Sequence, residues 1–291
     1  MGEQVCMTGA EYCDGAAVVD TYGYPVETTG NAVLDILEHR SSTRAFARDD
    51  NDRPVAVTDE QRAAILHAAS RAPSAGAMMM YSIVSIREQA TLDRLADLCD
   101  HQPMVAKAPW ALILVGDYAK WIDLFEHVGC FEPEFVKRTG KAPRRAPGLG
   151  DFAIAAQDAV IAAQNAVVAA EALGLGSCYI GDIVENAEEV AELLDLPPYT
   201  MPLSMLIIGA PRKERPAIAH PVVNLVHEER YCRADDATMD AQVAEMDAMF
   251  RPHAREVGER VVDIYTRKHT SPFMAEMSRS MEWWFKNWLG K

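Results

Sequence analysis

The sequence predicts a mixed fold of the α/β or α+β class. Two apolar runs, at residues 110–115 and 203–208, have the length and composition of buried strands, and a shorter β-rich run covers 81–86. Helical patterns separate these runs. The longest is an alanine-rich stretch at 151–173 that ends at Gly174. Because predicted strands alternate with predicted helices, the chain belongs to one of these two classes.

Local signals predict the remaining elements. Residues 31–39 have the apolar spacing of a helix, and Thr58-Asp59-Glu60-Gln61 opens a second helix with a capping box. The other elements expected are helices at 91–99, 121–128 and 187–194, a strand fragment at 179–183, a basic loop at 137–145, and a largely helical tail interrupted at Pro252 and Pro272.

Three segments are expected along the chain. Residues 1–28 have no hydrophobic period and are interpreted as a flexible leader, and residues 29–234 form the main domain. Residues 235–291 are a helical extension, too short for a large core of its own, that packs on the body or on a partner subunit. Trp283, Trp284 and Trp288 form one face of this extension. We expect that face to be a packing surface, with stacking on a ligand as the alternative.

Composition limits the classes of function. With 49% hydrophobic and 24% charged residues the chain is globular, and its net charge of −15 argues against nucleic acid as a partner. A phosphate-bearing cofactor stays possible, because it needs only a few local cations. The sequence has no signal-peptide pattern and no apolar run near the ~18 residues of a membrane span. We therefore expect a soluble cytoplasmic protein with no membrane partner.

Metal chemistry is not indicated. Six cysteines are scattered without a Cys-x-x-Cys pair, which fits a reducing cytosol better than a metal site or a disulfide framework. The eight histidines form neither His-x-x-x-His nor His-Glu-x-x-His. We expect no metal site.

Residues 40–46, Arg-Ser-Ser-Thr-Arg-Ala-Phe, are suited to binding a phosphate. The guanidinium groups of Arg40 and Arg44 are forked, permanently charged donors, and the hydroxyls between them are neutral donors. An exposed basic turn is the alternative interpretation of this segment alone.

A second motif covers residues 72–81, Ala-Pro-Ser-Ala-Gly-Ala-Met-Met-Met-Tyr. Pro73 ends the preceding helix, and Gly76 allows the backbone to approach a flat ligand closely. The three methionines either fill the core or line a ligand pocket, because methionine adapts to both settings.

Two further segments follow predicted elements. A glycine-rich segment at 174–182 follows the long helix, and residues 209–215, Gly-Ala-Pro-Arg-Lys-Glu-Arg, follow the last strand. Alone, each has a common structural explanation, as a helix exit and as a solvated turn. A fifth stretch, residues 99–109, leads into the strand at 110–115.

In this order, the segments between residues 31 and 226 resemble the nitroreductase family of FMN-dependent oxidoreductases. The fold that the resemblance implies is α+β: a three-layer sandwich with a mostly antiparallel sheet flanked by helices, in an intertwined homodimer. Family members place FMN at the subunit interface. The stretch at 99–109 also resembles a branch of the family but has no mechanistic role assigned to it.

The resemblance also implies which residues bind FMN. Arg40 and Arg44 take the phosphate and ribityl hydroxyls, Ser42 is a supporting donor, and Ser41 stands where the family has a basic residue. The backbone of Tyr179, Ile180 and Gly181 faces the flavin N5 and O4 edge, and Lys213 or Arg215 reaches the phosphate. The second motif contributes Pro73, Ser74, Ala75, Gly76, Ala77 and Met79, with Ala77 in place of the usual asparagine.

The implied activity is a ping-pong transfer. NADH or NADPH binds transiently and passes a hydride to flavin N5, and a small-molecule acceptor such as a nitroaromatic, quinone or activated alkene then takes the reducing equivalents. No side chain need act as an obligatory acid or base, so no catalytic residue is assigned. The alternative, motivated by Ser41 and Ala77, is a flavin-binding protein without turnover that serves as a sensor or flavin carrier.

Overall fold

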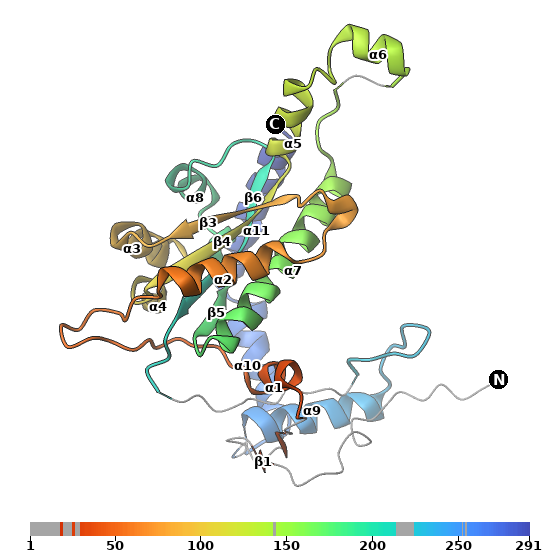
Figure 1. Ribbon diagram of the computed structural model, residues 1–291. Coiled ribbons are helices and arrows are strands. Elements are labelled where there is room, and N and C mark those ends of the chain that lie inside the picture. Colours follow the sequence, from red (N-terminus) through yellow and green to blue (C-terminus); the bar gives the residue numbers. More distant parts are fainter. Residues whose placement is uncertain are drawn as a thin grey trace. The chain divides into compact units, whose positions relative to one another are not determined.

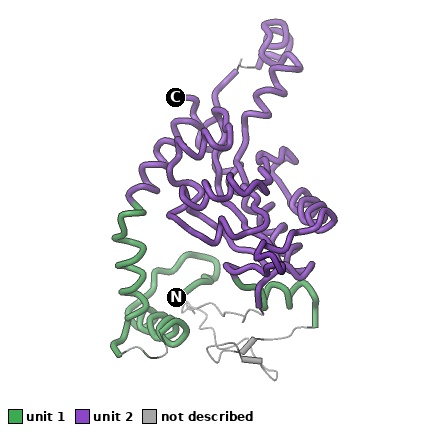
Figure 2. Tube along the Cα trace, turned by 90° about the vertical axis from the view of Figure 1, so that its left-hand side faces the viewer, with its two compact units in different colours: residues 1–41, 216–274 green, residues 42–215, 275–291 purple. Residues whose placement is uncertain are grey.

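The computed structural model describes residues 18–19, 25–26, 30–141, 144–213, 224–251, 253 and 255–291. The chain divides into two compact units (Figure 2). The sheet unit comprises residues 42–215 and 275–291, and the helical unit comprises residues 1–41 and 216–274. Each unit is described by itself.

The sheet unit is built on four antiparallel strands in the order β3-β4-β6-β5. They are β3 (Tyr81–Ile86), β4 (Trp110–Asp117), β5 (Gly176–Ile180) and β6 (Thr200–Gly209). All four strands were predicted. Three differ in their limits: β4 continues past residue 115 to Asp117, β5 begins before residue 179 and is followed by a 3₁₀ turn at Gly181–Val184, and β6 begins before residue 203. The antiparallel pairing assigns the fold to the α+β class.

Two helices, α2 (Asp59–Ser70) and α7 (Leu149–Ala172), cover one face of the sheet (Figure 1). α7 is long and apolar enough to cross a membrane, yet its alanines pack on the sheet as those of a core helix do. Small side chains permit this close approach. The residues of α7 in this core are Ala159, Ala162, Ala163, Ala166, Val167 and Ala170.

Several of the described helices pack on the opposite face and so complete a three-layer arrangement. They are α3 (Gln89–Leu98), α4 (Pro103–Ala106), α8 (Ala187–Leu193) and α11 (Pro272–Trp288). In α11 the side chains of Trp284 and Trp288 are fully buried. Their indole N–H groups donate to the carbonyls of Val184 at 2.9 Å and Gly148 at 3.1 Å. Both tryptophans are therefore core residues of the sheet unit.

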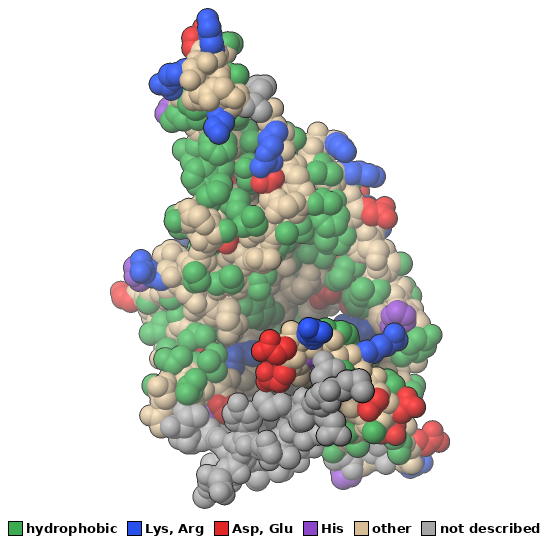
Figure 3. All heavy atoms as spheres, turned by 90° about the vertical axis from the view of Figure 1, so that its right-hand side faces the viewer, with side chains coloured by type: hydrophobic (Ala, Val, Ile, Leu, Met, Phe, Trp, Pro, Cys, Tyr) green, Lys and Arg blue, Asp and Glu red, His purple; other side chains and the backbone are tan. Residues whose placement is uncertain are grey.

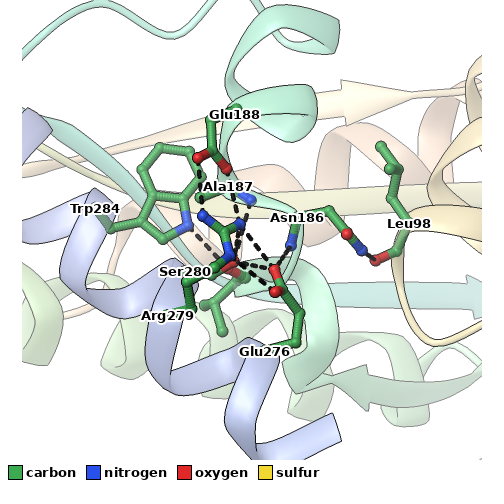
Figure 4. A network of polar contacts seen from close by, with 9 residues as sticks. Leu98, Asn186, Ala187, Glu188, Glu276, Arg279, Ser280 and Trp284 are labelled. Carbon is green, nitrogen blue, oxygen red and sulfur yellow. Dashed lines mark hydrogen bonds and ion pairs between the residues drawn. The ribbon is translucent and has the colours of Figure 1, made fainter.

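A polar network fixes α11 to the start of α8 (Figure 4). The Glu276 carboxylate accepts from the backbone N–H of Asn186 at 3.2 Å, and the Ser280 hydroxyl accepts from that of Ala187, also at 3.2 Å. Arg279 donates to Glu188 and to Glu276 at 2.8 Å. Side chains of α11 thus satisfy N–H groups at the beginning of α8, which helix geometry leaves without partners.

The rest of the sheet unit includes α5 (Ala119–His127) and α6 (Pro133–Thr139). The basic loop predicted at 137–145 is wrong at its start, because residues 137–139 complete α6. Pro133 suits the first turn of that helix, where a missing N–H costs nothing. Gly140, at φ 64°, ends the helix in the left-handed conformation.

The helical unit contains α1 (Ala32–His39), α9 (Asp236–Phe250) and α10 (Glu259–Ile264), which continues as a π-helical turn at Tyr265–His269. Two short strands, β1 (Val18–Val19) and β2 (Pro25–Val26), pair within the predicted leader. The rest of residues 1–28, and Pro252, lie outside the described residues. The flexibility of the leader and the domain limits at 29 and 235 remain predictions.

Candidate functional site

Backbone hydrogen bonds hold the first motif against the sheet. The N–H of Thr43 donates to the carbonyl of Ser177 on β5 at 2.8 Å. The N–H of Arg212, just after β6, donates to the carbonyl of Ala45 at 3.0 Å. Segments from the first, third and fourth sequence motifs therefore meet at one end of the sheet.

A cationic pocket lies at this end of the sheet and has a volume of about 510 Å³. Four basic side chains and one carboxylate are among the residues that line it. The lining residues are Arg44, Ala45, Phe46, Arg48, Asp52, Lys107 and Arg212. Arg48 pairs with Asp52, with 3.5 Å between Nη1 and Oδ2.

Gly209 allows the walls of this region to pack closely. A Cβ atom on Gly209 would lie 2.6 Å from Cγ of Pro109 and 2.8 Å from Cδ1 of Phe46. Any larger residue would push these side chains apart. Glycine at the end of β6 thus keeps the segment that contains Lys107 close to the first motif.

The residues predicted to hold phosphate occupy different positions. Ser42 and Arg44 are exposed in the sheet unit, whereas Arg40 and Ser41 belong to the helical unit. Lys213 is exposed and does not line the pocket, and Arg215 lies outside the described residues. The structure therefore places Arg44 in the pocket and leaves the other assignments as predictions.

Two buried polar atoms of the first motif lack hydrogen-bond partners within the described part of the chain. They are Oγ1 of Thr43 and Nε of Arg40. Leaving such atoms unpaired in the native state costs free energy, on the order of 1–3 kcal/mol each. In the sheet unit, a ligand with hydroxyl or phosphate oxygens, such as FMN, carries groups that fit the hydroxyl of Thr43.

The second motif forms a loop that is fixed to α7. Asp158, which is 3% exposed, accepts from the backbone N–H of Ala75 at 3.0 Å and from that of Met80 at 3.2 Å. Ser74 Oγ accepts from the N–H of Met79 at 3.1 Å, and the indole of Trp121 donates to the carbonyl of Met78 at 2.9 Å. Side chains on α7 and α5, together with Ser74 of the loop itself, therefore hold the backbone of the loop.

The outer edge of this loop is free to contact a ligand. Pro73, Ala75 and Gly76 are exposed, as are Ala77 and Met79. The φ angles are 59° at Gly76, 55° at Ala77 and 46° at Met79. These left-handed conformations are unfavourable for alanine and methionine, so the anchors on α7 hold the loop against local strain.

Tyr179, Ile180 and Gly181 lie at the end of β5. The side chain of Ile180 is buried in the core, whereas Gly181 is exposed. The hydroxyl of Tyr179 is 3.3 Å from Oε1 of Gln164 on α7. These contacts fix the end of β5, with Gly181 at the surface.

The loop of the second motif and the cationic pocket lie at opposite ends of the sheet. Tyr81, directly after the loop, pairs with Gly116, which in turn pairs with Met201 near the start of β6. The pocket adjoins Gly209 at the other end of that strand. At 3.4 Å per residue, this separation is on the order of 27 Å. One chain therefore does not bring the two motifs together.

Sequence reasoning missed three residues of these two regions. Asp158 is the single charged residue between Asp151 and Glu171 in an apolar helix, and that isolation is a signal that could have found it. Arg48 carried no signal, because isolated surface cations are common in any sequence, and Lys107 lies in the stretch at 99–109, to which no role was assigned. Both residues line the cationic pocket because separate segments of the chain meet there.

An antiparallel sheet between two helical layers, with a cationic pocket at one end, defines an α+β protein that can bind an anionic ligand. The model of the nitroreductase family matches residues 37–210. The chain belongs to the nitroreductase family.

Two curated relatives are similar over most of the chain. The FMN reductase [NAD(P)H] of Bacillus subtilis is 31% identical over 215 residues, covering 73% of this chain and 79% of the relative. The oxygen-insensitive NADPH nitroreductase of Salmonella typhimurium is 33% identical over 218 residues, covering 73% of this chain and 81% of the relative. Among solved structures, the NADPH:FMN oxidoreductase of Vibrio harveyi complexed with NAD⁺ matches with TM-score 0.66 and 25% identity, covering 86% of this chain and 97% of that chain.

Proposed function

We propose that this protein is an FMN-dependent oxidoreductase that uses NADH or NADPH to reduce a small electrophilic molecule. Bound FMN would supply the redox centre, accepting a hydride from the nicotinamide and passing reducing equivalents to a nitroaromatic, quinone or activated alkene. The chain's own residues bind and orient the reactants, and none is assigned as an acid or base. The protein is proposed to act in the cytoplasm, without nucleic acid or membrane partners.

One observation carries this proposal: the backbone bonds that join Thr43 to Ser177 and Ala45 to Arg212. They assemble three of the motifs that resemble those of the family at one end of the sheet, with Arg44 in a cationic pocket. The names of the relatives support the same activity, since they are FMN reductases and nitroreductases.

The residues present suit FMN. Arg44 would hold the phosphate, and the unpaired Oγ1 of Thr43 is a donor and acceptor for a hydroxylated chain. Roles for Arg40, Ser41, Ser42, Lys213 and Arg215 at the same cofactor remain part of the proposal.

A homodimer would complete the site. The loop of the second motif lies far along β6 from the cationic pocket, so a second copy is needed to place that loop over a flavin held by Arg44. The exposed face of α7 suits such an assembly, with Ile154 38%, Val160 48% and Ile161 40% exposed. The face of the sheet unit drawn in Figure 3 is rich in hydrophobic side chains. Exposed apolar surface of this kind marks interaction sites.

The test is an absorbance spectrum of the purified protein, with FMN added if none is bound, followed by anaerobic addition of NADH and then NADPH. Flavin bands that bleach with a nucleotide and return on addition of a quinone are the expected result. Flavin bands that neither nucleotide bleaches would favour a sensor or flavin carrier. A protein that binds no flavin would refute the proposal.

A further inference from the structure

We propose that Asp158 and Lys120 are positioning residues for the flavin. These two opposite charges hold the backbone of the second-motif loop from its buried side and set how readily the bound flavin accepts negative charge. This inference rests on the proposed function, which brings the outer edge of that loop against FMN. It gives a role to two residues that lie outside every sequence motif.

Both charges bind the backbone where the loop ends. The carboxylate of Asp158 accepts from the N–H of Met80 at 3.2 Å, and Nζ of Lys120 donates to the carbonyl of Tyr81, the next residue, at 2.5 Å. Nζ of Lys120 also lies 5.7 Å from the centre of the Tyr81 ring. Because Met80 and Tyr81 are consecutive, charges from two separate helices, α7 and α5, act on the same short stretch of backbone.

Asp158 is a buried charge without a direct counter-charge. Its residue is 3% exposed, and it forms no ion pair within the part of the chain that the structure describes. Its partners are the backbone N–H of Met80 and that of Ala75, at 3.0 Å. Burial of a carboxylate without an ion pair is costly and weakens the solvent screening of its field. The charge of Asp158 therefore acts on whatever contacts the loop.

Lys120 brings a positive charge to the same region. It is half-buried, and burial lowers its pKa, whereas the carboxylates of Asp117 and, less strongly, Asp158 oppose that shift. Asp117, which is 8% exposed, accepts from the backbone N–H of Lys120 at 3.2 Å and from the hydroxyl of Ser82 at 2.5 Å. Lys120 thus lies close to two carboxylates and offsets part of the negative field behind the loop.

The charges lie on the side of the loop opposite to its exposed edge. Asp158 binds the N–H groups of Ala75 and Met80 from the protein interior, while Gly76 and Ala77 are exposed. Transfer of a hydride from the nicotinamide to neutral oxidised FMN adds two electrons and one proton, so the ring system gains one negative charge. A fixed negative charge behind the loop disfavours that gain, and a fixed positive charge favours it.

The experiment measures the midpoint potential of FMN bound to the holoenzyme, by anaerobic titration against a reference dye. Asp158→Asn and Lys120→Met each remove one charge at similar size, and Lys120→Arg keeps the positive charge. Asp123→Asn and Lys286→Met are matched controls, because they remove exposed charges elsewhere, on α5 and on α11. The dissociation constant for FMN is measured in parallel by flavin fluorescence.

We expect the two charge-removing variants to move the potential in opposite directions. Asp158→Asn should raise it and Lys120→Met should lower it. Each should change the equilibrium ratio of reduced to oxidised flavin on the order of tenfold, which is about 30 mV for a two-electron couple. Lys120→Arg and both controls should keep the wild-type potential. Residues that only shape the loop would weaken FMN binding without such opposite shifts.

Shifts of the same sign, or potentials equal to wild type while FMN still binds, would overturn the inference and leave the proposed function intact. If Asp158→Asn does not fold, the two Lys120 variants decide. A lower potential in Lys120→Met with the wild-type value in Lys120→Arg sustains the inference, and equal potentials in both overturn it. A wild-type protein that binds no FMN would refute the proposed function and this inference with it.

Discussion

The carboxylate of Asp158 accepts a hydrogen bond from the backbone N–H of Met80 at 3.2 Å, while its second oxygen accepts from Ala75 at 3.0 Å. One buried side chain on α7 thereby closes both ends of the loop formed by the second motif. Three residues of the loop, Gly76, Ala77 and Met79, have φ angles in the left-handed region. Asp158 therefore maintains a strained conformation whose outer edge is exposed.

Replacing Asp158 by asparagine should destabilise the protein. The amide keeps the size of the side chain but supplies one acceptor oxygen, so one buried N–H loses its charged partner. The expected loss in free energy of unfolding is about 1.5–3 kcal/mol, measured by urea denaturation. Gln157→Ala, at an exposed neighbouring position on α7, is the control and should change stability little. Equal stability of Asp158→Asn and wild type would contradict the anchoring role.

Much of the fold could be predicted from the sequence because the signals are local. The runs at 110–115 and 203–208 are apolar enough to be recognised as buried strands, and the capping box at Thr58 is present in the structure. The limits of β5 could not be predicted. Ser177 and Cys178 are buried by pairing with β6, which is a long-range contact that no local pattern records.

The site could be predicted in part. Arg44 was predicted to bind phosphate from its own segment; the structure places it in the lining of the pocket, and its role stays a prediction. Lys107 and Arg48 could not be predicted as pocket residues. They become neighbours of Arg44 only through packing at Gly209 and through the segments that follow β6. The distance between the pocket and the second motif could not be predicted either, since the order of motifs along the chain carries no information on strand register.

Gly209→Ala should destabilise the protein and disturb the pocket. The new methyl group would lie 2.6 Å from Cγ of Pro109, well inside contact distance, so Phe46 and Pro109 must shift. Overpacking of this kind costs typically about 1–3 kcal/mol, observable as a lower urea midpoint. Gly150→Ala is the control, because a Cβ atom on Gly150 would have no other atom within 4 Å. A Gly209→Ala protein as stable as Gly150→Ala would mean that the contact relaxes freely.

Ala77→Asn should stabilise the loop and tighten flavin binding. Ala77 has φ 55°, a conformation that asparagine tolerates better than alanine. The gain should be about 0.5–1 kcal/mol in thermal unfolding. FMN affinity should also rise, because the amide adds a hydrogen-bonding group to the exposed edge of the loop. Ala75→Asn, in the same loop without a positive φ, should give neither effect, and a gain there as well would refute the explanation.

The clamp between α11 and α8 should weaken in acid. Arg279 above all, then Ser280 and the backbone N–H of Asn186, lower the pKa of Glu276 from 4.5 to about 2. A carboxyl with a depressed pKa stabilises the fold above pH 4.5, and that contribution is lost as pH falls toward 2. Urea unfolding of Glu276→Gln should therefore show a smaller decline in stability across this range than wild type. Glu282→Gln, on an exposed position of α11, should keep the wild-type slope, and parallel slopes for Glu276→Gln would contradict the assignment.

Ile161→Glu should prevent the proposed dimer. Ile161 is 40% exposed and adjoins Val160, which is 48% exposed, on a helix whose other face is committed to the core. A carboxylate on the apolar face would be buried unpaired in a two-fold interface, where each copy meets the other, and that arrangement is strongly unfavourable. Sedimentation velocity should then show a monomer, and circular dichroism should show native secondary structure. FMN binding should be weaker, since the loop at 73–79 would no longer reach the pocket of a second copy. Ala90→Glu, on the exposed start of α3 across the sheet, should remain dimeric. A dimer that persists in Ile161→Glu would exclude this face of α7 from the interface, and a wild-type monomer that binds FMN tightly would show that one chain suffices.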